Sequence, residues 1–214
     1  QEIEVNNFIL ISTDKAVNPS SVMGATKKLA EILVLNMNKI SATNFNIVRF
    51  GNVIGSNGSV ALIFQNQIKK GGPLTLTDAK MERYFMTISE AAALTLQATS
   101  IGSGGEIFVL DMGEPILIKT LAENMIKQCL LEPYKDIDIT IVGAKPGEKL
   151  SETLNGRDEI LEKTAYDKIH RIVTKKIHGT NLDQLQRFLS TVSYEDNDNI
   201  KSILGDLLPE YDNS

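Results

Sequence analysis

The sequence predicts an α/β fold, and three observations lead to that prediction. Residues 8–11 are a short, continuous apolar run, which is typical of a strand buried on both faces of a parallel sheet, and residues 46–50 are predicted to be a second short strand. Residues 22–39, which lie between them, carry the apolar stripe of an amphipathic helix. The connections between these segments are short, as in a sheet whose strands alternate with helices.

The first elements also have local signals at their ends. Ser20 or Ser21 follows an Asn-Pro turn and can cap the helix at 22–39. After the second strand, Gly51, Gly55 and Gly58 indicate an irregular loop.

Further helices and strands are predicted along the rest of the chain. Beyond Asn155 the pattern becomes charged and weakly amphipathic, so we expect a helical tail there. The predicted helices cover residues 60–70, 89–100, 118–131, 182–189 and 200–208, and the predicted extended segments cover 74–77 (exposed), 84–88, 106–110 and 137–142.

Composition excludes several classes of function. The 214 residues carry a net charge of −5, so no basic field is available and nucleic acid is not an expected partner. The single cysteine, Cys129, cannot form an internal disulfide, which fits a reducing compartment such as the cytoplasm. Apolar runs are too short to cross a bilayer. His170 and His178 have no acidic or cysteine partner nearby, so no metal site is expected.

Polar residues directly after the first strand are candidates for chemistry. Ser12, Thr13, Asp14 and Lys15 would lie beyond the carboxyl end of that strand, where open α/β sheets bind ligands. A hydroxyl, a carboxylate and an amine there can supply a hydrogen-bond donor, a general acid and a general base. The alternative is a polar turn in which Asp14 helps to cap.

Met23 and Lys27 form a second candidate pair. They are four residues apart, so they share one face of the predicted helix. The alternative for the lysine is an ordinary solvated side chain.

Together these segments resemble a known family. Residues 8–19 (FILISTDKAVNP), 22–31 (VMGATKKLAE) and 48–56 (VRFGNVIGS) closely resemble the extended short-chain dehydrogenase/reductase family, and within it the nucleotide-sugar 4,6-dehydratases of bacterial polysaccharide and capsule biosynthesis. Residues 81–87 (MERYFMT), 105–113 (GEIFVLDMG) and 145–150 (KPGEKL) extend the resemblance, which covers about residues 7–154.

The resemblance implies a function and a cofactor. It implies NAD-dependent dehydration of a UDP-linked N-acetylhexosamine to its 4-keto-6-deoxy derivative. Lys27 would bind the nicotinamide ribose, and Met23 stands where most relatives have the catalytic tyrosine, as in one membrane-anchored branch. Asp14 would be the acid, Lys15 the base, and Thr13 the hydrogen-bond partner of the sugar C4 hydroxyl.

The resemblance also implies contacts with the bound molecules. Ser12, Lys27, Phe50 and Gly51 would contact the cofactor. The substrate would be bound by Asn52 and by Ser59 and Val60 at a helix N-terminus. Arg83 would pair with a phosphate, and Glu148 would accept a hydrogen bond from the nucleotide ribose. Lys145, which stands where relatives usually have arginine, would also contact the substrate.

No G-x-G-x-x-G motif follows an early strand, so we expect only the C-terminal half of a Rossmann-like doubly wound parallel sheet, with a small α/β substrate-binding subdomain. We assign 1–58 and 104–131 to the partial dinucleotide-binding domain, 59–103 and 132–154 to the subdomain, and 155–214 to a charged helical tail.

The resemblance and the missing motif set the expected context. The complete enzyme would be a homo-oligomer with a cytoplasmic catalytic domain, and membrane contact would come only through a missing N-terminal region. The alternatives are a nucleotide-sugar C4 or C5 epimerase or a reductase of the same fold, and a non-catalytic truncated remnant.

Overall fold

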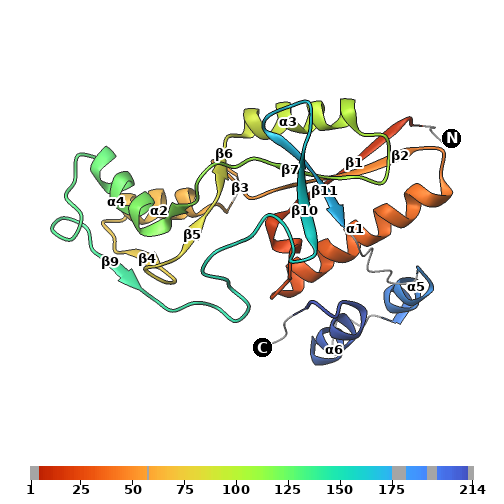
Figure 1. The fold of residues 1–214 in the computed structure, drawn as a ribbon. Coiled ribbons are helices and arrows are strands. Elements are labelled where there is room, and N and C mark those ends of the chain that lie inside the picture. Colours follow the sequence, from red (N-terminus) through yellow and green to blue (C-terminus); the bar gives the residue numbers. More distant parts are fainter. Residues whose placement is uncertain (1–4, 57, 175–181, 192–196, 212–214) are drawn as a thin grey trace. The chain divides into compact units, whose positions relative to one another are not determined.

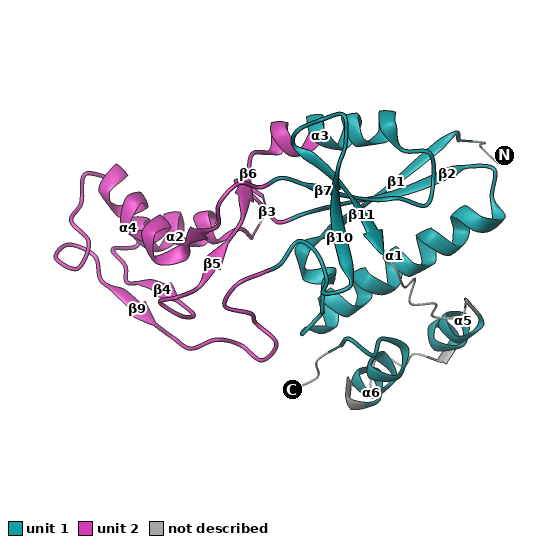
Figure 2. Cartoon of the chain, in the orientation of Figure 1, with its two compact units in different colours: residues 1–50, 93–111, 153–214 teal, residues 51–92, 112–152 magenta. Residues whose placement is uncertain are grey.

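The computed structural model describes residues 5–56, 58–174, 182–191 and 197–211. The chain divides into two compact units, coloured separately in Figure 2. Unit 1 comprises residues 1–50, 93–111 and 153–214, and unit 2 comprises residues 51–92 and 112–152. His178 lies outside the described residues.

A five-stranded sheet forms the centre of unit 1 (Figure 1). Its first three strands are parallel, and the last two are antiparallel to their neighbours. The middle strands are apolar because both of their faces are buried, as at Ile47 and Phe108. In spatial order the strands are β1 (Asn7–Thr13), β2 (Asn44–Phe50), β7 (Ile107–Leu110), β11 (Ile169–Thr174) and β10 (Glu159–Lys163).

Helix α1 (Val22–Ile40) packs against β1 and β2. It begins at Ser21, whose Oγ accepts a hydrogen bond of 3.1 Å from the backbone N of Gly24, so the predicted cap is present. Its apolar stripe, with Leu29 and Ile32, is covered by α5 (Leu182–Thr191) and α6 (Asn197–Leu207). Helix α3 (Ile88–Ile101) begins in unit 2 and continues into unit 1.

Unit 2 has three two-stranded pairs and two helices around a separate core. Leu74 and Leu76 are buried, so the strand predicted to be exposed is instead half-buried. The helices are α2 (Val60–Lys69) and α4 (Ile118–Gln128), and the pairs are β3 (Asn52–Val53) with β6 (Phe85–Met86), β4 (Leu74–Leu76) with β9 (Ile139–Ile141), and β5 (Glu82–Arg83) with β8 (Ile116–Leu117).

The predicted α/β class with a parallel sheet is confirmed, but three details differ. Residues 159–163 and 169–174 of the expected helical tail are strands of the main sheet. Helix α4, predicted with the dinucleotide-binding part, buries Ile118 and Ile126 in the core of unit 2. Ile11 of β1 is 53% exposed, because β1 is the edge of the sheet among the described residues.

Candidate active site

The candidate residues Ser12 to Lys15 lie at the carboxyl end of β1, as predicted. Thr13 ends the strand, and Asp14 begins the short 3-10 helix η1 (Asp14–Ala16). In the parallel ladder Thr13 is opposite Phe50, the last residue of β2. The strand ends therefore bring five predicted residues, Ser12 to Lys15 and Phe50, to one edge of the sheet.

Thr13 and Lys15 both donate hydrogen bonds to the same oxygen of Asp14. Thr13 Oγ1 is 2.8 Å and Lys15 Nζ is 2.9 Å from Asp14 Oδ1. The Asp14 side chain is fully buried, whereas 26% of the Lys15 side chain is exposed. Asp14 Oδ2 is also buried, and within the described part of the chain it receives no hydrogen bond. One carboxylate oxygen is thus left for another molecule, since buried polar atoms normally have a partner.

The first turn of α1 lies directly against this segment. A methyl group on Gly24 would be 2.3 Å from the carbonyl oxygen of Lys15, so only glycine permits this approach. Met23, beside it, is 49% exposed. Lys27 is half-buried, and its ammonium has no hydrogen bond or ion pair to any residue that the structure describes.

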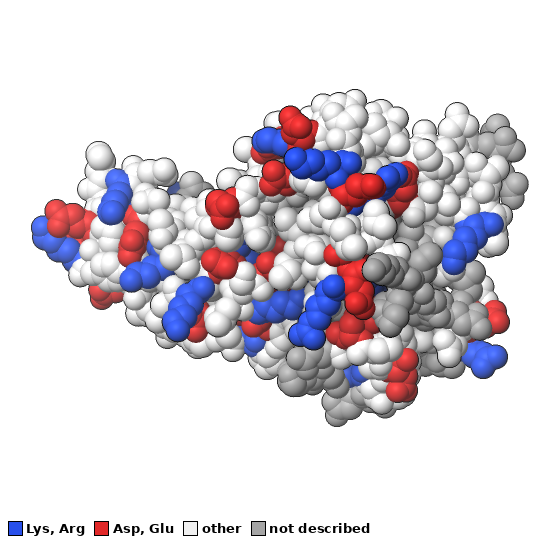
Figure 3. All heavy atoms as spheres, viewed as in Figure 1, with Lys and Arg blue, Asp and Glu red and all other residues white. Residues whose placement is uncertain are grey.

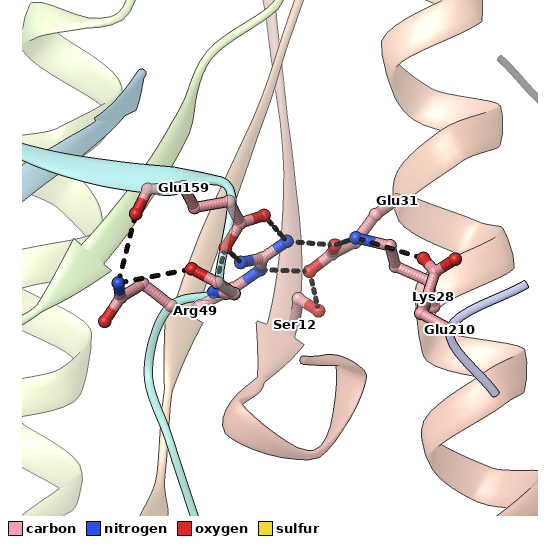
Figure 4. A network of polar contacts seen from close by, with 8 residues as sticks. Ser12, Lys28, Glu31, Arg49, Glu159 and Glu210 are labelled. Atoms are coloured by element: carbon pink, nitrogen blue, oxygen red, sulfur yellow. Dashed lines mark hydrogen bonds and ion pairs between the residues drawn. The ribbon is translucent and has the colours of Figure 1, made fainter. Parts of the chain in front are cut away.

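Ser12 contacts a buried ion pair between Arg49 and Glu31 (Figure 4). Ser12 Oγ donates to Glu31 Oε1 at 2.6 Å, and Arg49 donates to both oxygens of Glu31 at 2.7 Å. Arg49 is fully buried and also pairs with Glu159 at 2.7 Å. The sequence alone predicted no role for these charged residues, although an arginine within the predicted strand 46–50 is itself a signal of a paired buried charge.

The network changes the pKa values of two of its members. Burial would lower the pKa of Arg49, but the two carboxylates outweigh burial and raise it above its usual range. Burial would raise the pKa of Glu159, but the hydrogen bonds and charge of Arg49 outweigh burial and lower it below the ordinary 4.5. Both groups are therefore held in their charged forms.

The lowered pKa of Glu159 predicts a pH-dependent effect of Glu159→Gln. A carboxyl group with a lowered pKa stabilises the folded state above its unfolded pKa of 4.5, and this stabilisation is lost as the pH falls through the folded-state value. The variant should therefore be less stable than the wild type at neutral pH, and the difference should shrink at pH values below 4.5. Urea denaturation of the variant and the wild type, at neutral pH and below pH 4.5, measures this difference in unfolding free energy. An equal difference at the two pH values would contradict a lowered pKa for Glu159.

In unit 2, Arg83, Lys145 and Glu148 are brought together. The guanidinium of Arg83 donates to the carbonyl oxygens of residues 82, 149 and 150 at 2.7–3.1 Å and lies 3.9 Å from the carboxylate of Glu148. That carboxylate also accepts a hydrogen bond of 3.1 Å from the backbone N of Lys145. Two of these three hydrogen bonds of Arg83, those to residues 149 and 150, thus hold the 145–150 loop.

The remaining predicted residues of unit 2 lie at the start of short elements. Asn52 begins β3, and its backbone N donates to the carbonyl of Tyr84 at 3.0 Å. Ser59 is the N-cap of α2, which begins at Val60, as predicted. Its hydroxyl makes no capping bond and, among the described residues, has no hydrogen-bond partner. Gly51 is the first residue of this unit.

Surface charges and metal-ligating side chains are two further features of the described residues. On the face drawn in Figure 3, lysine and arginine side chains alternate with aspartate and glutamate. Within the described ranges, no group of three His, Cys, Asp or Glu side chains could hold a metal ion. None of the described helices combines the length and the apolar character needed to span a membrane.

Several known proteins are similar in sequence. CapD of Staphylococcus aureus, a capsular polysaccharide biosynthesis protein, is 53% identical over 80% of this chain and 28% of its own length. An uncharacterized membrane protein of Methanocaldococcus jannaschii is 42% identical over 95% of this chain and 63% of its own length. A UDP-glucose 4-epimerase of Rickettsia rickettsii is 34% identical over 87% of this chain and 53% of its own length. The chain thus spans 28% to 63% of these relatives.

Solved structures share the fold. The X-ray structure of Pen from Bacillus thuringiensis is 38% identical, covers 80% of this chain and 54% of that chain, and has a TM-score of 0.72. The dTDP-glucose 4,6-dehydratase DesIV from Streptomyces venezuelae, a double mutant solved with NAD and DAU bound, has a TM-score of 0.61 at 17% identity over 71% of this chain and 52% of that chain, which shows the fold alone. The family described as "Polysaccharide biosynthesis protein" matches residues 1–174. This chain therefore belongs to the polysaccharide biosynthesis protein family and, as its sequence motifs predicted, has the fold of the short-chain dehydrogenase/reductase enzymes.

Proposed function

We propose that this chain carries the reaction centre of an NAD-dependent 4,6-dehydratase that acts on a UDP-linked N-acetylhexosamine in polysaccharide biosynthesis. One observation carries the proposal: Thr13 and Lys15 share one oxygen of buried Asp14, and Asp14 Oδ2 is left without a partner among the described residues. This buried oxygen can still accept a hydrogen bond, and we assign that capacity to a sugar hydroxyl. The removal of water requires an acid for the C6 hydroxyl and a base for the C5 proton, and we assign these roles to Asp14 and Lys15.

NAD+ would supply the redox chemistry by taking a hydride from sugar C4 and returning it at C6. Its fit is supported by the ammonium of Lys27, which has no hydrogen bond or ion pair to any residue that the structure describes. Ser12, Phe50 and Gly51 complete the proposed cofactor contacts. Asn52, Ser59, Val60, Arg83, Lys145 and Glu148 are the proposed substrate contacts.

The three residues at the end of β1 can balance the protons of the reaction. Thr13 passes the proton of the C4 hydroxyl to Asp14, along its 2.8 Å hydrogen bond. Asp14 then gives that proton to the C6 hydroxyl, which leaves as water. Lys15 takes the C5 proton and later returns it to C5. Each residue ends in its starting state.

Lys15 must be neutral before it can accept the C5 proton. The structure shows it as an ion pair with Asp14, at 2.9 Å. The proposed cycle therefore starts only after this ammonium has given one proton to solvent, which can reach it because 26% of the side chain is exposed. Met23, which has no dissociable proton, takes no part in these transfers.

An epimerase of the same fold is the second candidate, and the similarity to the Rickettsia UDP-glucose 4-epimerase favours it. NMR analysis of the product separates the two. We expect the full-length gene product, given UDP-N-acetylglucosamine and NAD+, to form a 4-keto-6-deoxy sugar, seen as a new C6 methyl signal. A product with only inverted C4 or C5 and no methyl signal would support the epimerase and refute the dehydratase.

A further inference from the structure

Glu31, Arg49 and Glu159 form one buried charge network beside the candidate reaction centre (Figure 4). The Arg49 guanidinium lies between the two carboxylates and makes two hydrogen bonds to each. Its Nη1 is 2.7 Å from Glu159 Oε2, and its Nη2 is 3.1 Å from Glu159 Oε1. The side chains of Arg49 and Glu31 are 0% and 1% exposed, and that of Glu159 is 13% exposed. Water therefore contributes little to holding these charges.

Stability alone does not account for such a network. Removing charges from water is costly, and well-packed apolar side chains of similar volume are often as stabilising as a buried ion pair, or more so. Paired hydrogen bonds between a guanidinium and a carboxylate fix direction as well as distance. The network therefore supplies a defined geometry that an apolar core would not.

The network connects β10 with the strand that carries the candidate catalytic residues. Glu159 of β10 holds Arg49 of β2, Arg49 holds Glu31 of α1, and Glu31 accepts the hydroxyl hydrogen of Ser12 at the end of β1. Ser12 is also opposite Arg49 in the β1–β2 ladder. The next residue after Ser12 is Thr13. A displacement of Arg49 therefore acts on the backbone that orients the reaction centre.

Glu159 is itself held by the turn that precedes it. The backbone N of Gly156 donates to Glu159 Oε2 at 2.7 Å, and Asn155 Nδ2 donates to the Glu159 carbonyl at 3.1 Å. At the other end of the network, Lys28 lies 3.9 Å from both Glu31 and Glu210. Residues 155 and 156 thus hold Glu159 in place. Glu159 can therefore fix the position of Arg49, which is 110 residues away in sequence.

We propose that Glu159 is a positioning residue of the reaction centre, which holds Thr13, Asp14 and Lys15 in place through Arg49 and Glu31. This inference rests on the proposed dehydratase function. Glu159 acts through other residues and has no assigned contact with substrate or cofactor.

The test compares Glu159→Gln with Glu162→Gln in the full-length gene product. Glu162 is on the same strand, is 51% exposed and pairs with Arg171, so it is a matched control. For Glu159→Gln we expect kcat to fall about 10- to 100-fold, because small misplacements of catalytic groups have effects of that size. KM should stay within about twofold, because uniform substrate binding is unchanged. Glu162→Gln should change neither constant.

Amide hydrogen exchange provides a readout that does not depend on turnover. Peptides that cover residues 13–16 should exchange faster in Glu159→Gln than in the wild type, and Glu162→Gln should match the wild type. A merely structural role would lower the unfolding temperature but leave kcat per folded molecule and this local exchange unchanged, and that result would overturn the proposal.

The two proposals can fail separately. If the wild type forms no 4-keto sugar, the dehydratase function fails, but faster exchange at residues 13–16 in Glu159→Gln would still show that Glu159 orders this segment. If the wild type is active and Glu159→Gln keeps both its kcat and its exchange rates, the positioning role is wrong and the dehydratase function stands.

Discussion

The Asp14→Asn variant is expected to form the 4-keto-6-deoxy product about 10²- to 10⁴-fold more slowly than the wild type, the usual contribution of a positioned acid or base. Asparagine keeps an oxygen that can accept the hydrogen bonds from Thr13 and Lys15, so the local geometry can persist. It cannot carry the proton that must reach the C6 hydroxyl. The loss should therefore appear in kcat, while KM changes little.

Product NMR at several substrate concentrations measures this effect. Asp158→Asn is the control, because Asp158 is an exposed aspartate of the same unit. The unfolding temperature of each variant must be compared with that of the wild type, so that unfolding is not mistaken for lost chemistry. A kcat for Asp14→Asn within tenfold of the wild-type value would rule out Asp14 as the acid.

The Arg49→Met variant is expected to lose about 3–5 kcal/mol of unfolding free energy, the typical cost of leaving a buried charge without its partner. Methionine fills the space of the arginine's aliphatic stem and leaves that of the guanidinium empty. The carboxylates of Glu31 and Glu159 would then face each other without a cation between them. Such an effect is large compared with the total stability of most domains.

Urea denaturation of the full-length gene product measures the loss. Arg171→Met is the matched control, because Arg171 is 44% exposed and pairs with Glu106 and Glu162 at the surface, where pairs contribute about 0–1 kcal/mol. The triple variant of Glu31→Gln, Arg49→Met and Glu159→Gln should recover part of the loss, since no charge is left unpaired. Equal losses for Arg49→Met and Arg171→Met would contradict a buried network.

Strong periodicity made much of the fold predictable. The helix at 22–39 and the strands at 8–11 and 46–50 match α1, β1 and β2, because each has a clear apolar pattern. Polar residues after the first strand also predicted where Thr13, Asp14 and Lys15 lie. These signals are local, so a single sequence is enough to read them.

Strands β10 and β11 could not be predicted in the same way. In β10 four of five residues are exposed, so no alternation of apolar and polar residues marks it. Its place depends on backbone pairing with β11 and on the contact of Glu159 with Arg49, which is 110 residues away in sequence. Contacts over such separations leave no periodic signal.

The sequence predicted which residues belong to the candidate site, but not which hydrogen bonds and ion pairs they make within the protein. Arg83 and Glu148 are predicted to contact bound molecules, which stays a prediction, and the structure adds that they pair with each other and hold the 145–150 loop. Motif resemblance can place a residue in a loop, but it does not reveal which of its donors the protein itself uses. Only three-dimensional packing decides that.

The packing of α5 and α6 on α1 has a consequence for folding during synthesis. Ile32 of α1 is covered by Leu204 and Leu208, about 170 residues later in the chain. At the usual rates of 5–20 residues per second, the ribosome needs roughly 10–35 s to add that much chain. Until α5 and α6 have been made, the face of α1 that packs on them lacks this cover, so we expect a nascent chain of this protein to bind chaperones that recognise exposed apolar helices.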